Sequence, residues 1–151
     1  MNAKILFVDD DACILDAYRR MLGRTFEVET AIGAAEALAL VAADGPFAVV
    51  VSDMRMLGLD GIGLLAKVRQ MAPQTVRIML TGADNQEAIQ GVTEGKIFRF
   101  LSKPCSRETL TQAIEDAVAQ YEAATAQATP VAPASTLAGA VRMVTAALAG
   151  K

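Results

Sequence analysis

The chain has 151 residues, about the size of one compact domain with a short extension. No stretch of about 18 consecutive apolar residues occurs, so we expect no membrane span. Fourteen basic against seventeen acidic residues give a net charge of −3, which argues against a nucleic-acid-binding surface on this segment. The absence of histidine excludes Ser-His-Asp catalysis and His-ligated zinc or haem. Because the start has no signal-peptide pattern and only two cysteines occur, we expect a cytoplasmic protein with reduced, buried thiols.

The chain alternates short apolar runs with segments of helical period. The apolar runs predict five β-strands, at residues 4–8, 26–30, 47–52, 76–80 and 97–101. The remaining segments predict five helices, at residues 14–22, 34–43, 62–68, 85–94 and 106–121. We expect Asp11 to cap the first helix and Ser106 to cap the last, because both side chains can accept a hydrogen bond from the first helical turn.

Five β–α repeats predict an α/β fold with a doubly wound parallel sheet, right-handed crossovers and helices on both faces. The third run, FAVVVS, is almost entirely apolar and indicates a central strand that is covered on both sides. The second run, FEVET, carries two glutamates and favours an edge or near-edge position. In such folds ligands bind outside the carboxyl ends of the strands.

Polar side chains gather at those predicted strand ends. An acidic run from Asp9 to Asp11 follows the first strand, and Asp53, Thr81 and Lys103 follow the third, fourth and fifth. Neighbouring carboxylates repel one another, so such a cluster needs a cation, and an all-oxygen donor set favours Mg²⁺ or Mn²⁺ over zinc. A hard metal ion, a lysine and a hydroxyl around one carboxylate indicate phosphoryl transfer with aspartate as the nucleophile.

Four motifs at these positions, ILFVDDD, VVVSDMRMLGLDG, MLTGA and IFRFLSKP, resemble those of the response-regulator receiver domain. The resemblance covers residues 4–121 and implies a flavodoxin-like (βα)5 fold with strand order 2-1-3-4-5. It implies Mg²⁺ (or Mn²⁺) as cofactor and a sensor histidine kinase or phosphotransfer protein as partner. Asp53 is the implied phosphoacceptor, Lys103 the phosphate-binding lysine, Thr81 the switch hydroxyl and Phe100 the switch aromatic.

The metal ligands implied by the resemblance are Asp9, Asp10, Asp53 and the backbone carbonyl of Arg55. The family also suggests a cis peptide bond before Pro104. Phosphorylation would change the surface formed by the fourth helix, fifth strand and fifth helix, through which two copies could form a homodimer.

The phosphoacceptor loop departs from the family pattern at one position. Leu57 stands where the family usually has a proline, and Gly58 is then expected to supply the local bend. The switch aromatic is a phenylalanine rather than a tyrosine, so it has no hydroxyl to donate.

Two other functions compete with this interpretation. An aspartate-nucleophile phosphohydrolase would use Asp9 and Asp11, but Ala12 and Cys13 follow where that class has hydroxylic or β-branched residues, and Asp53 would have no role. A degenerate receiver that acts only as an interaction module would lack an acid or the lysine, and none is missing. We therefore expect a signalling domain rather than an enzyme.

The composition changes near residue 121. We expect a receiver domain at 1–121, an Ala/Pro-rich linker at 122–136 and a short amphipathic helix at 137–151. Leu137, Val141, Val144 and Leu148 form the apolar seam of that helix, which is expected to begin an output domain. The fifth strand and this segment weakly resemble receivers fused to helical output domains of the HD type.

Overall fold

The computed structural model describes residues 3–56, 58–82 and 97–128 of the chain. Five parallel strands form one sheet in the order β2-β1-β3-β4-β5, which confirms the predicted flavodoxin-like fold. β3 is central and β2 lies at an edge, as the sequence predicts. The elements follow in the order β1 (Lys4–Asp9), α1 (Ala12–Leu22), β2 (Glu27–Ile32), α2 (Gly33–Asp44), β3 (Val49–Asp53), α3 (Gly61–Met71), β4 (Val76–Thr81), β5 (Arg99–Ser102) and α5 (Arg107–Ala128).

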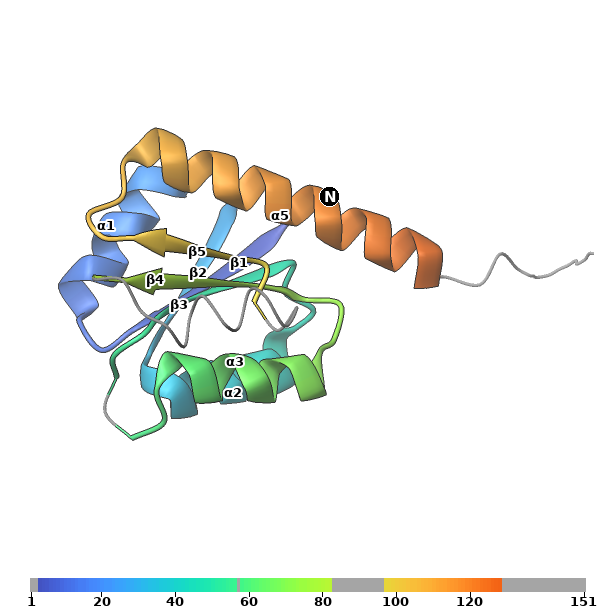
Figure 1. Cartoon of the computed structure of the whole chain (residues 1–151), viewed down its shortest axis with the longest axis horizontal. Helices are drawn as coiled ribbons and strands as arrows, with labels where there is room; N and C mark the ends of the chain where they lie inside the picture. The colour runs from blue at the N-terminus through green and yellow to red at the C-terminus, as the bar shows by residue number, and fades with distance from the viewer. Residues whose placement is uncertain (1–2, 57, 83–96, 129–151) are drawn as a thin grey trace, which may run out of the picture.

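Helices cover both faces of the sheet, with α1 and α5 on one face and α2 and α3 on the other (Figure 1). Successive side chains of a strand point to opposite faces, so each strand serves two apolar cores. On β1, Ile5 and Phe7 belong to the core between the sheet and helices α1 and α5. Leu6 and Val8 belong to the core between the sheet and helices α2 and α3. The sheet is therefore covered by helices on both faces.

Side-chain caps fix where three helices begin. Asp11 accepts a hydrogen bond from the backbone N–H of Cys13, and Ser106 accepts one from Thr109. Both caps are as predicted. Asp60 caps α3 by accepting from Gly63 at 2.8 Å, a contact that the sequence analysis did not single out. Cys13 lies in the first turn of α1 and is exposed, which corrects the expectation that both thiols are buried.

The fifth strand is shorter than predicted. β5 begins at Arg99, so Phe98 precedes it in a bend. As a result Phe98 packs toward α1 and α5, whereas Phe100 packs against the opposite core. The predicted helix at 85–94 lies outside the described residues.

The last helix is longer than predicted. α5 continues to Ala128, so the predicted linker at 122–136 begins inside a helix. Alanine marks a change of composition but is also the strongest helix former, which explains the difference. Residues 129–151 lie outside the described part, and the domain boundary at 121 and the amphipathic helix at 137–151 stay predictions. Within the described ranges, no helix is both long enough and apolar enough to cross a membrane.

The connection from β3 to α3 is held by the backbone. Met54 donates its N–H to the carbonyl of Leu80, and its own carbonyl accepts from Gly61, both at 2.9 Å. Gly58 adopts a φ of 78°, so it supplies the bend expected of it. A Cβ at Gly61 would lie only 2.4 Å from the carbonyl oxygen of Asp53. This close approach requires glycine at position 61.

We predict that Gly61→Ala lowers the free energy of unfolding by about 1–3 kcal/mol, because the backbone after Asp53 must shift to admit the methyl group. Helix propensity alone would change stability in the opposite direction, because Gly61 begins α3. Gly82→Ala is the matched control, since no described atom lies within 4 Å of a Cβ built there. Urea unfolding of the three proteins measures both effects, and equal stability of the two variants would contradict the steric argument.

Candidate functional site

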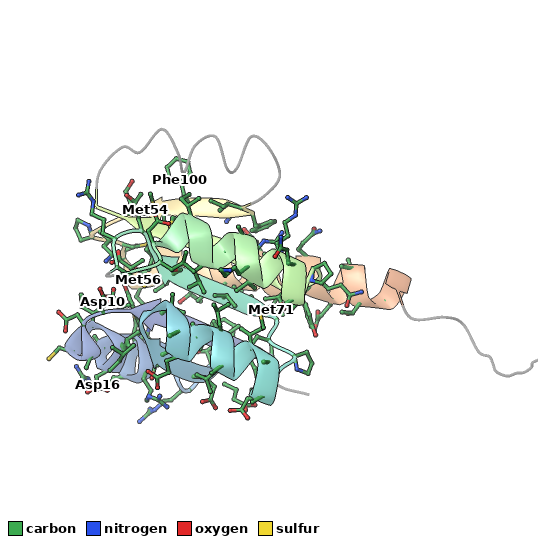
Figure 2. The ribbon with its side chains drawn as sticks, turned by 90° about the horizontal axis from the view of Figure 1, so that it is seen from below. Asp10, Asp16, Met54, Met56, Met71 and Phe100 are labelled. Carbon is green, nitrogen blue, oxygen red and sulfur yellow. The ribbon has the colours of Figure 1, made fainter. Side chains whose placement is uncertain are left out.

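The carboxyl ends of four parallel strands meet at one edge of the sheet. Asp9 ends β1, Asp53 ends β3, Thr81 ends β4, and Lys103 directly follows β5. The backbone N–H of Lys103 donates to the carbonyl of Thr81 at 2.7 Å, which fixes the backbone of the lysine beside β4. Met54 and Met56, in the loop after Asp53, lie at the same end of the molecule as Asp10 (Figure 2). The sheet thus brings distant parts of the sequence to one site.

The ammonium of Lys103 joins two carboxylates. Its Nζ lies 2.8 Å from Oδ1 of Asp53 and 3.5 Å from Oδ2 of Asp9. The Asp9 side chain is only 5% exposed and that of Asp53 14% exposed, so both charges are largely removed from water. The peptide bond between Lys103 and Pro104 is cis, as the resemblance implies.

The charge of Lys103 is maintained by these partners. Burial lowers the pKa of its ammonium, but the hydrogen bond to Asp53 and the charges of Asp53 and Asp9 outweigh burial and raise the pKa above its ordinary value. Lys103 is therefore protonated at neutral pH. It places one fixed positive charge where an anionic group would approach Asp53.

Asp9 and Asp10 have different surroundings although they are neighbours. Asp9 is buried, and its Oδ1 accepts a hydrogen bond from the N–H of Asp11. Asp10 is exposed, and its Oδ1 lies 3.6 Å from the position that a Cβ on Gly33 would occupy. Its carboxylate therefore lies beside the start of α2, at the rim of the site.

The two carboxylates beside Lys103 offer oxygen ligands, the type that hard metal ions such as Mg²⁺ prefer. Asp9 and Asp53 contribute oxygen atoms and both reach a single cation, the Lys103 ammonium. In the part of the chain that the structure describes, no three Asp, Glu, His or Cys side chains lie together so that they could hold a metal ion. The structure thus brings the predicted ligands Asp9 and Asp53 together, whereas the third acidic ligand, Asp10, lies beside Gly33. Arg55, whose carbonyl is the fourth predicted ligand, is exposed in the loop after β3.

The two predicted switch residues lie on adjacent strands. Thr81 is buried at the end of β4 and pairs in register with Ser102. Phe100 pairs with Met79, is partly buried, and packs against the core under α2 and α3. The two side chains are therefore two register positions apart on the same strand pair. The fourth helix of the predicted switch surface lies outside the described residues.

Tyr18 of α1 is a further residue near the site. Its ring stacks on Phe7 with centroids 4.7 Å apart. Burial raises the pKa of its phenol, while the charge of Lys103 lowers it in part. The helical spacing predicts that Tyr18 faces the core, but no sequence signal relates it to Lys103.

The sequence matches the response regulator receiver domain family over residues 5–115. It is 38% identical over 118 residues to the hydrogenase transcriptional regulatory protein HoxA of Cupriavidus necator, covering 78% of this chain and 24% of that protein. It is 36% identical over 121 residues to the transcriptional regulatory protein FixJ of Bradyrhizobium diazoefficiens, covering 80% and 58%. The chain thus spans about a quarter of the length of HoxA.

Two solved structures resemble this one closely. The signal receiver domain of an HD domain-containing protein from Pseudomonas fluorescens Pf-5 has a TM-score of 0.76 at 32% identity, over 82% of this chain and 99% of that one. A structure described as adenylate cyclase from Rhodopirellula baltica has a TM-score of 0.80 at 40% identity, over 85% and 96%. With the family match, the sheet order and the ends of its strands, these likenesses show that the chain belongs to the response regulator receiver domains of two-component signalling.

Proposed function

We propose that Asp53 accepts a phosphoryl group from the phosphohistidine of a sensor histidine kinase or phosphotransfer protein in the cytoplasm. A carboxylate oxygen of Asp53 attacks phosphorus, the bond from phosphorus to the donor imidazole nitrogen breaks, and the imidazole keeps the electron pair. The observation that carries the proposal is the 2.8 Å contact between the Lys103 ammonium and Asp53. The domain acts as a phosphoacceptor in signalling and assists only its own phosphorylation and dephosphorylation.

Charge is the main obstacle to this reaction. The incoming phosphoryl group is an anion, and it approaches a site that already holds two carboxylates. Lys103 offsets part of this repulsion because its raised pKa keeps it protonated. Asp9 and Asp53 already lie around one cation, and we propose that Mg²⁺ (or Mn²⁺) binds there and draws in Asp10 and the carbonyl of Arg55 from the rim of the site. The ion would supply the remaining positive charge.

Thr81 and Phe100 transmit the change to the surface. A phosphoryl group on Asp53 offers acceptor oxygens to the Thr81 hydroxyl, and movement of Thr81 opens space for Phe100 on the neighbouring strand. The surface of the fourth helix, β5 and α5 then changes. Its described part carries the ion pair between Arg99 of β5 and Asp116 of α5, at 2.9 Å.

We also propose that this receiver controls an output domain or a partner, and that two copies associate through the fourth helix, β5 and α5. The small share of HoxA that the chain spans supports a longer regulator. The likeness to a receiver from an HD domain-containing protein supports a helical output domain of the HD type. Mass spectrometry of the natural protein from its source would show whether such a domain is attached.

Asp53 should be the only site of acyl phosphate. Incubation with a small-molecule phosphodonor and Mg²⁺ is expected to add one phosphoryl group to the parent protein and none to Asp53→Asn, since the amide is a poor nucleophile. Intact-mass spectrometry at neutral pH measures the addition. Stoichiometric labelling of Asp53→Asn would show that another residue is the nucleophile.

Labelling should require the metal ion, and Asp10 should matter more than Asp11. EDTA is expected to block labelling. Asp10→Asn should weaken Mg²⁺ binding by about tenfold, because it removes one charged ligand. Asp11→Asn is the matched control, since asparagine is as good a helix cap as aspartate. Titration of labelling rate against Mg²⁺ concentration separates the two variants, and equal affinities would remove Asp10 from the metal site.

Thr81→Ala should leave labelling of Asp53 intact but abolish the response of Phe100, because it deletes the hydroxyl that meets the phosphoryl group. Thr81→Ser keeps that hydroxyl and should preserve the response. The NMR shifts of the Phe100 ring, with and without phosphorylation, report the outcome. Identical shift changes in the alanine variant and the parent protein would contradict the proposed route.

A further inference from the structure

A groove lies at the end of the sheet opposite the phosphoacceptor site. We name it the basal groove, and its volume is about 470 Å³. One wall is formed where strands begin, by Lys4 of β1, Glu27 of β2 and Ala48 just before β3. The other wall is the distal part of α5, at Tyr121, Glu122 and Thr125. The basal groove is therefore separated from Asp53 by the length of the strands.

The basal groove is apolar in its walls and acidic at its rim. Pro46 is exposed and Ala3 and Tyr121 are partly buried, so these three side chains give carbon surface to the groove. Glu27 and Glu122 are exposed. The one described cation of the lining, Lys4, donates to the backbone carbonyl of Asp44 and lies 4.8 Å above the Phe47 ring. An apolar ligand with a positive charge beside its contact face would suit this groove.

The sequence that follows α5 has this character. Leu137, Val141, Val144 and Leu148 recur at spacings that place them on one face of a helix. Arg142 is the only charged residue between Glu122 and Lys151. A helix with one such apolar face needs a surface to cover it.

The tether between groove and segment has a suitable length. α5 ends at Ala128, less than one turn beyond Thr125 of the groove. Residues 129–136 can span about 26–29 Å when extended, enough for the chain to turn back. A short tether also provides an effective concentration of the order of millimolar, so docking within one chain is favoured over docking between chains at micromolar concentrations.

We propose that residues 137–148 dock as an amphipathic helix in the basal groove of the same chain. The four seam residues cover the carbon surface of Pro46 and Tyr121, and Arg142 lies beside Glu122 and Glu27. Because the basal groove is remote from Asp53, this inference does not depend on phosphoryl transfer.

Hydrogen exchange of the full chain, followed by mass spectrometry, tests the proposal. Peptides covering 137–148 should exchange more slowly than the free-peptide rate. Val144→Asp should accelerate their exchange at least about tenfold, because it loses the burial of one valine side chain. Exchange of the β3 peptide should stay unchanged in every variant, which shows that the receiver itself is folded.

The charge contact is tested by a swap. Arg142→Glu should accelerate exchange of 137–148 about two- to fivefold, the range for one exposed ion pair. Adding Glu122→Arg to Arg142→Glu should restore protection. The control Lys151→Glu makes the same charge change beyond the docked residues 137–148 and should have no effect. Unprotected exchange of 137–148 in the parent chain, or equal effects of Arg142→Glu and Lys151→Glu, would overturn the proposal. Protection that rises with protein concentration would assign the segment to a second copy and overturn it as well.

Discussion

The structure of the site depends on one cation placed between two shielded carboxylates. Asp9 and Asp53 lie at the ends of adjacent strands, where their charges repel and little water is present to screen them. Lys103, which directly follows β5, compensates both charges. Removing one member of such a buried group leaves an uncompensated charge, which is far more costly than the net stabilisation that the intact group provides. The strand order and the backbone bond from Lys103 to Thr81 serve to hold the ammonium in place.

The same constraint gives the domain two functionally different ends. The carboxyl ends of the strands carry the charged site, and their amino ends form one wall of the basal groove. α5 begins a few residues after Lys103 and reaches past the sheet at the other end (Figure 1). A single helix thus runs from the end of the sheet that carries Lys103 to the place where the rest of the chain continues. This makes α5 the direct structural link between the receiver and whatever follows it.

Much of the fold follows from the sequence, because a strand that is covered on both faces must be almost entirely apolar, as FAVVVS is. The strand order came from the resemblance, since apolar runs alone do not determine which strands are neighbours. The gathering of Asp9, Asp53 and Lys103 also follows, because the ends of parallel strands meet at one edge of a sheet. The position of Asp10 beside Gly33 does not follow, since an exposed side chain takes its direction from local backbone geometry. The need for glycine at position 61 is equally hidden, although Gly61 ends the motif VVVSDMRMLGLDG, because it arises from the close approach of this position to the backbone carbonyl of Asp53. The helix α5 ends at Ala128 rather than at the predicted residue 121, because an alanine-rich sequence is compatible with both a linker and a helix.

The long sequence separation within the charged group has a consequence for newly made protein. Lys103 is 50 residues from Asp53 and 94 residues from Asp9. Contacts of such separation form late in folding, because long loops must close before they can be made. A chain whose fifth strand has not yet joined the sheet exposes its acidic residues without their ammonium. Under the proposed function, such a chain would repel an incoming phosphoryl group, and it would become able to accept one only when the whole sheet is complete.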